Sequence, residues 1–282
     1  AIFGPPGVGK TTLLKSLPAD ETVCLDLEAG MKSVQDWRGA SIPVRSFTDF
    51  RDLAVLIGGH DPAQHPKSWY GAEYHAWLQQ QYLGTGIEDF LARKRIVFVD
   101  SITDLTRQAM AYARQQPEAF SDRTGKPDVR GAYGLLGREV IQALKHLQHA
   151  RGKTVIFVTH DMSVHANIAD RVGIVYAGKL VEDGPTRDMF FAPKHPYTAH
   201  LVASLPRIGD TSQRPSLEGR PPNLSDPPSG CRFHPRCPLA VEKCRSSAPP
   251  LETVARDHRT ACWRWQDVKP LVGNAHRAGV PA

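Results

Sequence analysis

The sequence of 282 residues has no long hydrophobic run. No segment approaches the roughly 18 consecutive apolar residues of a membrane-spanning helix, and no basic-then-apolar leader opens it. These absences predict a cytoplasmic protein that touches a membrane only through its partners. The sequence begins AIFGPP without a methionine, so we expect a truncated first strand or a fragment.

Cysteine is scarce, and four of the five cysteines lie close to the carboxyl end. Clustered cysteines in a cytosolic protein indicate metal binding more often than disulfides. Their spacing, C-x5-C-x6-C-x17-C, suits a four-iron, four-sulfur cluster or a tetrahedral zinc ion, with unligated thiols as the alternative. His234 and His258 are spare potential ligands. The predicted metal ligands are Cys231, Cys237, Cys244 and Cys262.

Neither positive nor negative charge dominates the sequence, which has 35 Lys and Arg residues and 29 Asp and Glu residues. The chain carries a formal net charge of +6, most of it beyond residue 205. A basic tail could meet nucleic acid or an acidic partner, and a solvated tail is the alternative interpretation.

Apolar runs typical of strands alternate with helical stretches over most of the chain, and 41% of the residues are hydrophobic. This pattern predicts an α/β fold, a three-layer core with a mainly parallel sheet. Beyond residue 205 prolines become frequent and the pattern fades. We therefore expect a nucleotide-binding domain over 1–205 and a small, irregular, Pro-rich extension containing the cysteines over 206–282. The expected strands are 1–3, 22–27, 95–99, 154–158 and 172–176.

A phosphate-binding motif follows the first expected strand. GPPGVGKTT satisfies the Walker A pattern G-x-x-x-x-G-K-S/T, and TLLKSL after it predicts a helix. Backbone N–H groups of such a loop surround phosphates, Lys10 would reach the β and γ oxygens, and the Thr11 hydroxyl would ligate Mg²⁺. The sequence therefore predicts that ATP and Mg²⁺ bind at Gly4, Pro5, Gly7, Val8, Gly9, Lys10, Thr11 and Thr12.

A second part of the site is expected at Asp100. It ends the apolar run RIVFVD, where an acidic residue would hold Mg²⁺ through water in a P-loop NTPase. Capping of the following helix is the alternative role.

Residues 1 to about 153 resemble the phage-type RecA-like ATP-binding proteins of the AAA group. The resemblance rests on GPPGVGKTT, LDLEAGMKSV, VFVDSITDLTR and SDRTGKPDVRGAYGLLGREVIQALKHLQ. It implies a RecA-like sheet and identifies Glu28 as the catalytic carboxylate that activates water. Asp26 is a weaker candidate, and a merely solvent-facing or capping Glu28 is the alternative.

The same resemblance implies a role in phage recombination with single-stranded DNA. Arg123, Lys126 and Arg130 lie in a polar stretch and would suit phosphate contacts. A solvated charged loop is the alternative.

From about Val155 onward the chain resembles the ATP-binding subunits of oligopeptide and dipeptide ABC importers. The resemblance rests on THDMSVHANIADRVGIVYAGKLVEDGP, KHPYTAHLVASLP, GCRFHPRCPLAVEKC and RTACW. It implies that His160 contacts the γ-phosphate during catalysis and that the cysteines hold iron and sulfur. It also implies permease subunits and a second ATP-binding subunit as partners, on the cytoplasmic face of the inner membrane.

Parts of the importer pattern are missing. The chain has no LSGGQ-type sequence ahead of the strand at 95–99, no recognisable Gln loop, and Ser101 in place of the catalytic Glu. The chain thus resembles a join of two P-loop proteins, with a seam near 154–160. We predict an ATP-binding protein of peptide-importer type with Mg²⁺-dependent hydrolysis. The alternatives are a phage ATPase acting on single-stranded DNA and a nucleotide-binding module without turnover.

Overall fold

The structure is a computed structural model that describes residues 1–4, 9–121, 123–160, 162, 168–205 and 217–269. The chain divides into two compact units. The central unit is Thr11–Val158, and the terminal unit comprises Ala1–Lys10 and Thr159–Ala282. The division thus falls after Val158. The sequence-based boundary near residue 205 stays a prediction.

The central unit is built on a parallel sheet. Its strand order is β3-β2-β4-β5, and every neighbouring pair is parallel. All of β2 is buried, as is β4 after its first residue, which fits the apolar runs that a doubly covered parallel sheet requires. Three strands were expected, but the short β3 was missed. The strands are β2 (Thr22–Asp26), β3 (Ala40–Pro43), β4 (Ile96–Asp100) and β5 (Thr154–Thr159).

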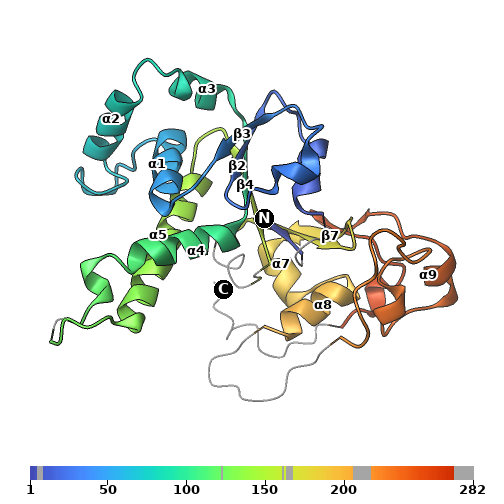
Figure 1. The fold of residues 1–282 in the computed structure, drawn as a ribbon. Coiled ribbons are helices and arrows are strands. Elements are labelled where there is room, and N and C mark those ends of the chain that lie inside the picture. The colour runs from blue at the N-terminus through green and yellow to red at the C-terminus, as the bar shows by residue number, and fades with distance from the viewer. Residues whose placement is uncertain (5–8, 122, 161, 163–167, 206–216, 270–282) are drawn as a thin grey trace. The chain divides into compact units, whose positions relative to one another are not determined.

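Three longer helices of the central unit pack on one another: α1 (Phe47–Gly58), α4 (Ile102–Ala113) and α5 (Val129–Gln148) (Figure 1). α5 is the helix that leads into β5 in the sequence. A capping box at Ser46 fixes the start of α1, because its side chain accepts from the Asp49 N–H while Asp49 accepts in return. Two shorter helices, α2 (Ala72–Gln81) and α3 (Ile87–Arg93), lie between α1 and β4 in the sequence.

The helix expected after the phosphate motif is a 3-10 helix, Thr11–Ser16, and not an α-helix. Pro18 disfavours a helical conformation at Leu17, which limits the segment to six residues. Two more 3-10 segments follow at Gly30–Val34 and Pro117–Ala119.

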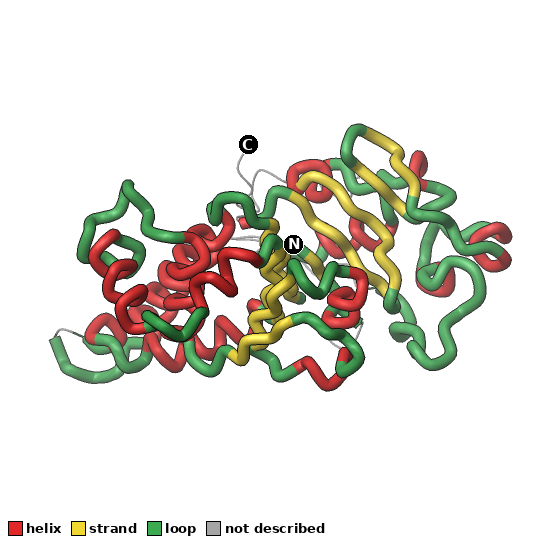
Figure 2. The backbone as a smooth tube through the Cα atoms, turned by 90° about the horizontal axis from the view of Figure 1, so that it is seen from above, coloured by secondary structure: helices red, strands yellow, loops and turns green. Residues whose placement is uncertain are grey.

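The terminal unit carries strands in the order β1-β6-β7-β9-β8. β1 runs parallel to β6, whereas the other pairs are antiparallel. Strands are drawn in yellow in Figure 2. Ala177 and Gly178 turn the chain between β6 and β7 with positive φ angles of 47° and 77°. β1 and β6 were expected from the sequence, and the other three strands were missed. The strands are β1 (Ile2–Phe3), β6 (Arg171–Tyr176), β7 (Lys179–Pro185), β8 (Glu252–Ala255) and β9 (His258–Thr260).

The cysteine-rich tail shares the core of the terminal unit. The buried ring of Phe233 lies 5.1 Å from that of Tyr176 and 5.4 Å from that of Tyr197. Because β9 also pairs with β7, tail residues are joined to the β6–β7 hairpin by both packing and strand pairing. The helices of this unit are α7 (Thr186–Phe191), α8 (Pro196–Ala203) and α9 (Glu242–Ser246), with 3-10 turns at His234–Arg236 and Trp265–Asp267.

Within the described residues, no helix combines the length and the apolar character that crossing a bilayer requires.

Candidate functional site

Thr11 and Asp100 meet at the carboxyl end of β4. The Thr11 hydroxyl donates a hydrogen bond to Asp100 Oδ2 over 2.5 Å. Asp100 is the last residue of β4 and only 2% exposed, and Thr11, within the phosphate motif, is the first residue of the 3-10 helix. The structure therefore brings together two predicted Mg²⁺ ligands that lie 89 positions apart in the sequence.

Asp26 and Gly30 complete this edge of the sheet. Asp26 is the direct strand neighbour of Asp100 and accepts a hydrogen bond from the Gly30 N–H at 3.1 Å. A Cβ atom at Gly30 would lie 3.4 Å from Asp100 Oδ2 and 3.5 Å from Thr11 Oγ1. Gly30 therefore lies directly beside this oxygen pair, where a Cβ atom would make ordinary van der Waals contact. Sequence reasoning missed Gly30, although the EAG turn after a strand was a visible signal.

The oxygen pair suits a hard cation. Burial raises the pKa of the Cys24 thiol, and the nearby carboxylates of Asp100 and Asp26 contribute to the same direction. Hydroxyl and carboxylate oxygens are the ligands that Mg²⁺ prefers. Thr11 and Asp100 thus fit the predicted ion by chemistry and by position.

Glu28 lies in the turn directly after β2. The N–H groups of Leu27 and Glu28 donate to the Asp100 carbonyl oxygen at 2.8 Å and 3.3 Å. The Glu28 side chain is exposed, and Ala29 turns the chain with φ 58°. Glu28 therefore stands at the same edge as Asp100, with its carboxylate open to solvent. Its catalytic role stays a prediction.

Part of the phosphate motif, Gly4 and residues 9–12, lies within the described residues. The Lys10 ammonium donates to the carbonyl oxygen of the buried Gly4 at 2.8 Å. Gly9 has φ 89°, a left-handed conformation that strongly favours glycine. Thr12 is exposed. Pro5, Gly7 and Val8 lie outside the described residues.

His160 follows β5 directly and its side chain is exposed. Thr159, the last residue of the strand, is buried. The proposed contact between His160 and a γ-phosphate stays a prediction.

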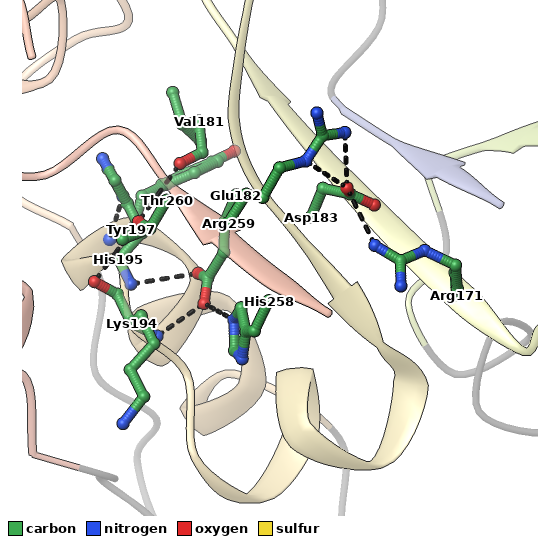
Figure 3. Close-up of polar contacts among 10 residues, drawn as sticks. All are labelled: Arg171, Val181, Glu182, Asp183, Lys194, His195, Tyr197, His258, Arg259 and Thr260. Carbon is green, nitrogen blue, oxygen red and sulfur yellow. Dashed lines mark hydrogen bonds and ion pairs between the residues drawn. The ribbon is translucent and has the colours of Figure 1, made fainter. Parts of the chain in front are cut away.

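A buried carboxylate organises the terminal unit, and sequence reasoning missed it. Glu182 on β7 is fully buried, and its carboxylate accepts hydrogen bonds from the backbone N–H groups of Lys194 and His195 and from His258 Nε2, the last at 2.7 Å (Figure 3). The next residue, Asp183, points to the other face of the strand and pairs with Arg171 and Arg259.

These contacts explain part of the importer-like sequence KHPYT. The His195 N–H donates to Glu182, and its ring Nδ1 accepts the Tyr197 N–H at 3.1 Å, which caps the start of α8. His258 is consequently a partner of Glu182 and not a spare metal ligand. His234 Nδ1 lies 3.0 Å from the Cys231 carbonyl oxygen.

The predicted metal site is not confirmed. Among the described residues, no group of three or more His, Cys, Asp or Glu side chains has an arrangement that could hold a metal ion. Burial, and to a smaller extent the neighbouring thiols, raise the pKa of Cys237 to about 11 and that of Cys262 to about 12. Cys237 and Cys262 are partly buried, and their raised pKa values favour the protonated thiol at neutral pH. Spacing in the sequence could not reveal whether their sulfur atoms converge on one point.

The residues predicted to contact DNA lie around the start of α5. Arg123, Lys126 and Arg130 are exposed, and the turn is held by a bridge between Phe120 and Pro127. Exposed basic side chains of this kind are equally typical of a solvated loop.

Two family models match the chain. One, described as an AAA domain, matches residues 1–168, and the other, described as the oligopeptide/dipeptide transporter C-terminal region, matches residues 181–244. These matches confirm both resemblances.

The matches to curated relatives cover about half of this chain. A putative peptide import ATP-binding protein of Brucella melitensis is 41% identical over 137 residues, which is 46% of this chain and 40% of the relative. The dipeptide transport ATP-binding proteins DppD of Caldanaerobacter subterraneus and Bacillus subtilis are 42% and 37% identical, over 49% and 44% of this chain. The matches cover 42% and 38% of those relatives. The chain thus spans less than half the length of these three relatives. All three are named for peptide or dipeptide transport, so they do not favour the single-stranded DNA alternative.

Proposed function

The chain belongs to the AAA domain family, and from that premise we propose that it binds ATP with Mg²⁺, hydrolyses ATP, and acts as an ATP-binding subunit of peptide-importer type. The observation that carries the nucleotide part is the 2.5 Å hydrogen bond between Thr11 and Asp100. This bond connects Thr11, near the end of the phosphate-binding motif, to Asp100 at the end of β4, and a P-loop site uses both residue types to hold Mg²⁺.

The chain's own residues have separate tasks in this proposal. Lys10 exchanges its bond to the Gly4 carbonyl oxygen for phosphate oxygens, and backbone N–H groups of the motif orient them. Thr11 and Asp100 would hold Mg²⁺, which neutralises charge on the phosphates when bound. The exposed carboxylate of Glu28 accepts a proton from the attacking water. His160 is proposed as a donor to the γ-phosphate.

The importer part of the proposal is supported by the tail. The match over residues 181–244 and the names of three relatives concern peptide or dipeptide transport. We propose permease subunits and a second ATP-binding subunit as partners, on the cytoplasmic face of the inner membrane. Because the chain has no LSGGQ-type sequence, the second subunit would have to close the nucleotide site formed here.

An ATPase assay tests this function directly. Activity would be measured for the protein alone, with a second importer subunit and vesicles carrying a peptide permease, and with single-stranded DNA. We expect stimulation by the permease vesicles and loss of activity in Asp100→Asn. Asp104→Asn is the matched control, because Asp104 lies on α4 and bonds Ser101 and Arg107. Stimulation by DNA only would overturn the importer assignment, and activity without dependence on Asp100 would overturn the nucleotide site.

A finer part of the proposal concerns the four tail cysteines as ligands of a four-iron, four-sulfur cluster or zinc. It is supported by the electrostatic proximity of the thiols and by N–H groups directed at sulfur, such as Arg264 N–H to Cys262 Sγ at 3.4 Å. Iron, acid-labile sulfide and zinc analysis of anaerobically purified protein tests it. Absence of all three would remove the metal part and leave the ATPase part intact.

A further inference from the structure

The central unit has a large groove that the proposed ATPase does not use. It measures about 1670 Å³ and is lined by α5, by the segment after α1, and by parts of α2 and α3. Small-molecule pockets usually measure about 300–1,000 Å³. The groove therefore suits a segment of another protein better than a metabolite.

One wall of the groove is an apolar stripe of α5. Tyr133 and Ile141 line it and are 60% and 42% exposed, and Gly137 lies midway between them on the same helix face. The neighbouring face of α5 is already buried in the unit's core. A helix with two apolar faces is normally covered on both. The buried face consists of Ala132, Leu135, Val140, Ala143, Leu144 and Leu147.

Among the residues that the structure describes, nothing packs closely enough on two glycines in this wall to require a glycine there. A Cβ atom at Gly137 would meet nothing within 4 Å, and one at Gly134 would meet only the Arg138 guanidinium at 3.8 Å. At Gly131, by contrast, a Cβ atom would lie 2.0 Å from the Glu118 carbonyl oxygen. Each glycine inside a helix costs about 1 kcal/mol relative to alanine. Small residues at this spacing allow the backbone of a second helix to approach closely.

The rims of the groove carry opposite charges. On the α5 side lie the exposed Arg138, Lys145 and Arg151, and on the α3 side lie Glu88 and Asp89. No ion pair joins any of these five side chains to another described residue. A docking segment with acidic residues on one flank and basic residues on the other would complement both rims.

We propose that this groove docks an amphipathic helix of a partner protein. Its apolar stripe, with small residues at the closest approach, packs on Tyr133, Gly137 and Ile141. Its acidic flank faces Arg138 and Lys145, and its basic flank faces Glu88 and Asp89. Helix-in-groove recognition works in this way, with apolar anchors for affinity and rim charges for orientation.

A designed peptide tests the proposal. The probe is a fluorescent peptide of about 18 residues, because shorter peptides are marginal helices. It carries a Leu and Ala stripe with Glu on one flank and Lys on the other. In a second peptide the alanines at the centre of the stripe are replaced by leucines, and this peptide serves as a bulky control. Binding to the full chain is measured by fluorescence anisotropy, and we expect the bulky peptide to bind at least about tenfold more weakly.

Three variants separate docking from folding. Ile141→Glu places a charge in the stripe, and Gly137→Leu fills the groove while raising helix propensity. Both variants should bind the first peptide, with its Leu and Ala stripe, at least about tenfold more weakly than the unchanged protein does. Gly137→Leu should not lower the midpoint of thermal unfolding. Val129→Glu is the matched control, because Val129 is 64% exposed on α5 but does not line the groove. Equal binding by Gly137→Leu and the unchanged protein would overturn the proposal. So would peptide-independent self-association that Ile141→Glu abolishes, because the occupant would then be a second copy of the chain.

Discussion

His258 Nε2 lies 2.7 Å from Glu182 Oε1, and both side chains are almost completely buried. The pair connects β9, in the cysteine-rich tail, to β7, in the importer-like hairpin. Because Glu182 also accepts the N–H groups of Lys194 and His195, one carboxylate holds three segments of the terminal unit together. Gly184 makes room for this arrangement, since a Cβ atom there would lie 2.9 Å from the His258 ring.

Replacing Glu182 should make local unfolding of β9 in the tail more frequent. In Glu182→Gln the amide can accept from only one side, so a buried N–H group loses its partner, at a cost of about 1–3 kcal/mol. We expect faster hydrogen exchange in β9 (His258–Thr260), measured by mass spectrometry. Asp183→Asn is the control on the other strand face, where exposed ion pairs contribute at most about 1 kcal/mol. Equal protection of β9 in Glu182→Gln and the unchanged protein would contradict the role given to Glu182.

The nucleotide edge gives a second prediction. Thr11→Ala removes the hydroxyl that contacts Asp100 and should weaken Mg²⁺-ATP binding while leaving ATP binding in EDTA nearly unchanged. Loss of a hydrogen bond to a charged group predicts an effect of about 1.5–3 kcal/mol, or roughly ten- to hundredfold in affinity. Isothermal titration with and without Mg²⁺ measures it. Thr106→Ala is the matched control, because the Thr106 hydroxyl donates to the Ile102 carbonyl oxygen of its own helix. A similar loss in EDTA would mean that Thr11 acts on the phosphates and not through the ion.

The parts of the site that could be predicted are those encoded by short, contiguous stretches of sequence. The phosphate motif spans nine residues, and Asp100 closes an apolar strand, so the Thr11–Asp100 pair could be expected from the sequence alone. Gly30 was missed, because its place beside Thr11 and Asp100 depends on residues that are distant in the sequence. The central strands were predictable from continuous apolar runs, whereas β3 is short and only partly buried.

The terminal unit was harder to predict for a physical reason. β7 contains Glu182 at a fully buried position, so its hydrophobic pattern is interrupted. The partner that makes this burial tolerable, His258, is 76 residues away in the sequence. The pairing of β7 with β9 likewise depends on a three-residue strand with no apolar pattern of its own.

His195 gives a pH prediction. Burial lowers the pKa of His195 to about 3, and its Nδ1 must stay unprotonated to accept the Tyr197 N–H. Its pKa in the unfolded chain is about 6.5. Between these values only the unfolded state binds the proton, so this group removes stability as the pH falls, by up to about 1.4 kcal/mol per pH unit.

The variant His195→Asn isolates this effect, because asparagine can still cap α8 but does not titrate. Between pH 6.5 and 4 its free energy of unfolding should fall less steeply than that of the unchanged protein. Urea unfolding of both proteins, followed by fluorescence at several pH values, provides the comparison. Parallel curves would show that His195 has the same pKa in the folded and the unfolded protein, and would contradict this prediction.

The tail cysteines give the last prediction, which concerns the metal-free protein. Burial raises the pKa values of Cys231, Cys237 and Cys262, the last to about 12, so almost no thiolate is present at neutral pH. After treatment with chelator and reductant, these thiols should react with a disulfide reagent much more slowly than the same thiols in urea, because the thiolate is the reactive form. All five cysteines should react in urea. Rapid reaction of the folded, metal-free protein at pH 7 would show that the tail opens readily. A rate that increases only after the chelator is added would show that a bound metal had been holding the sulfur atoms.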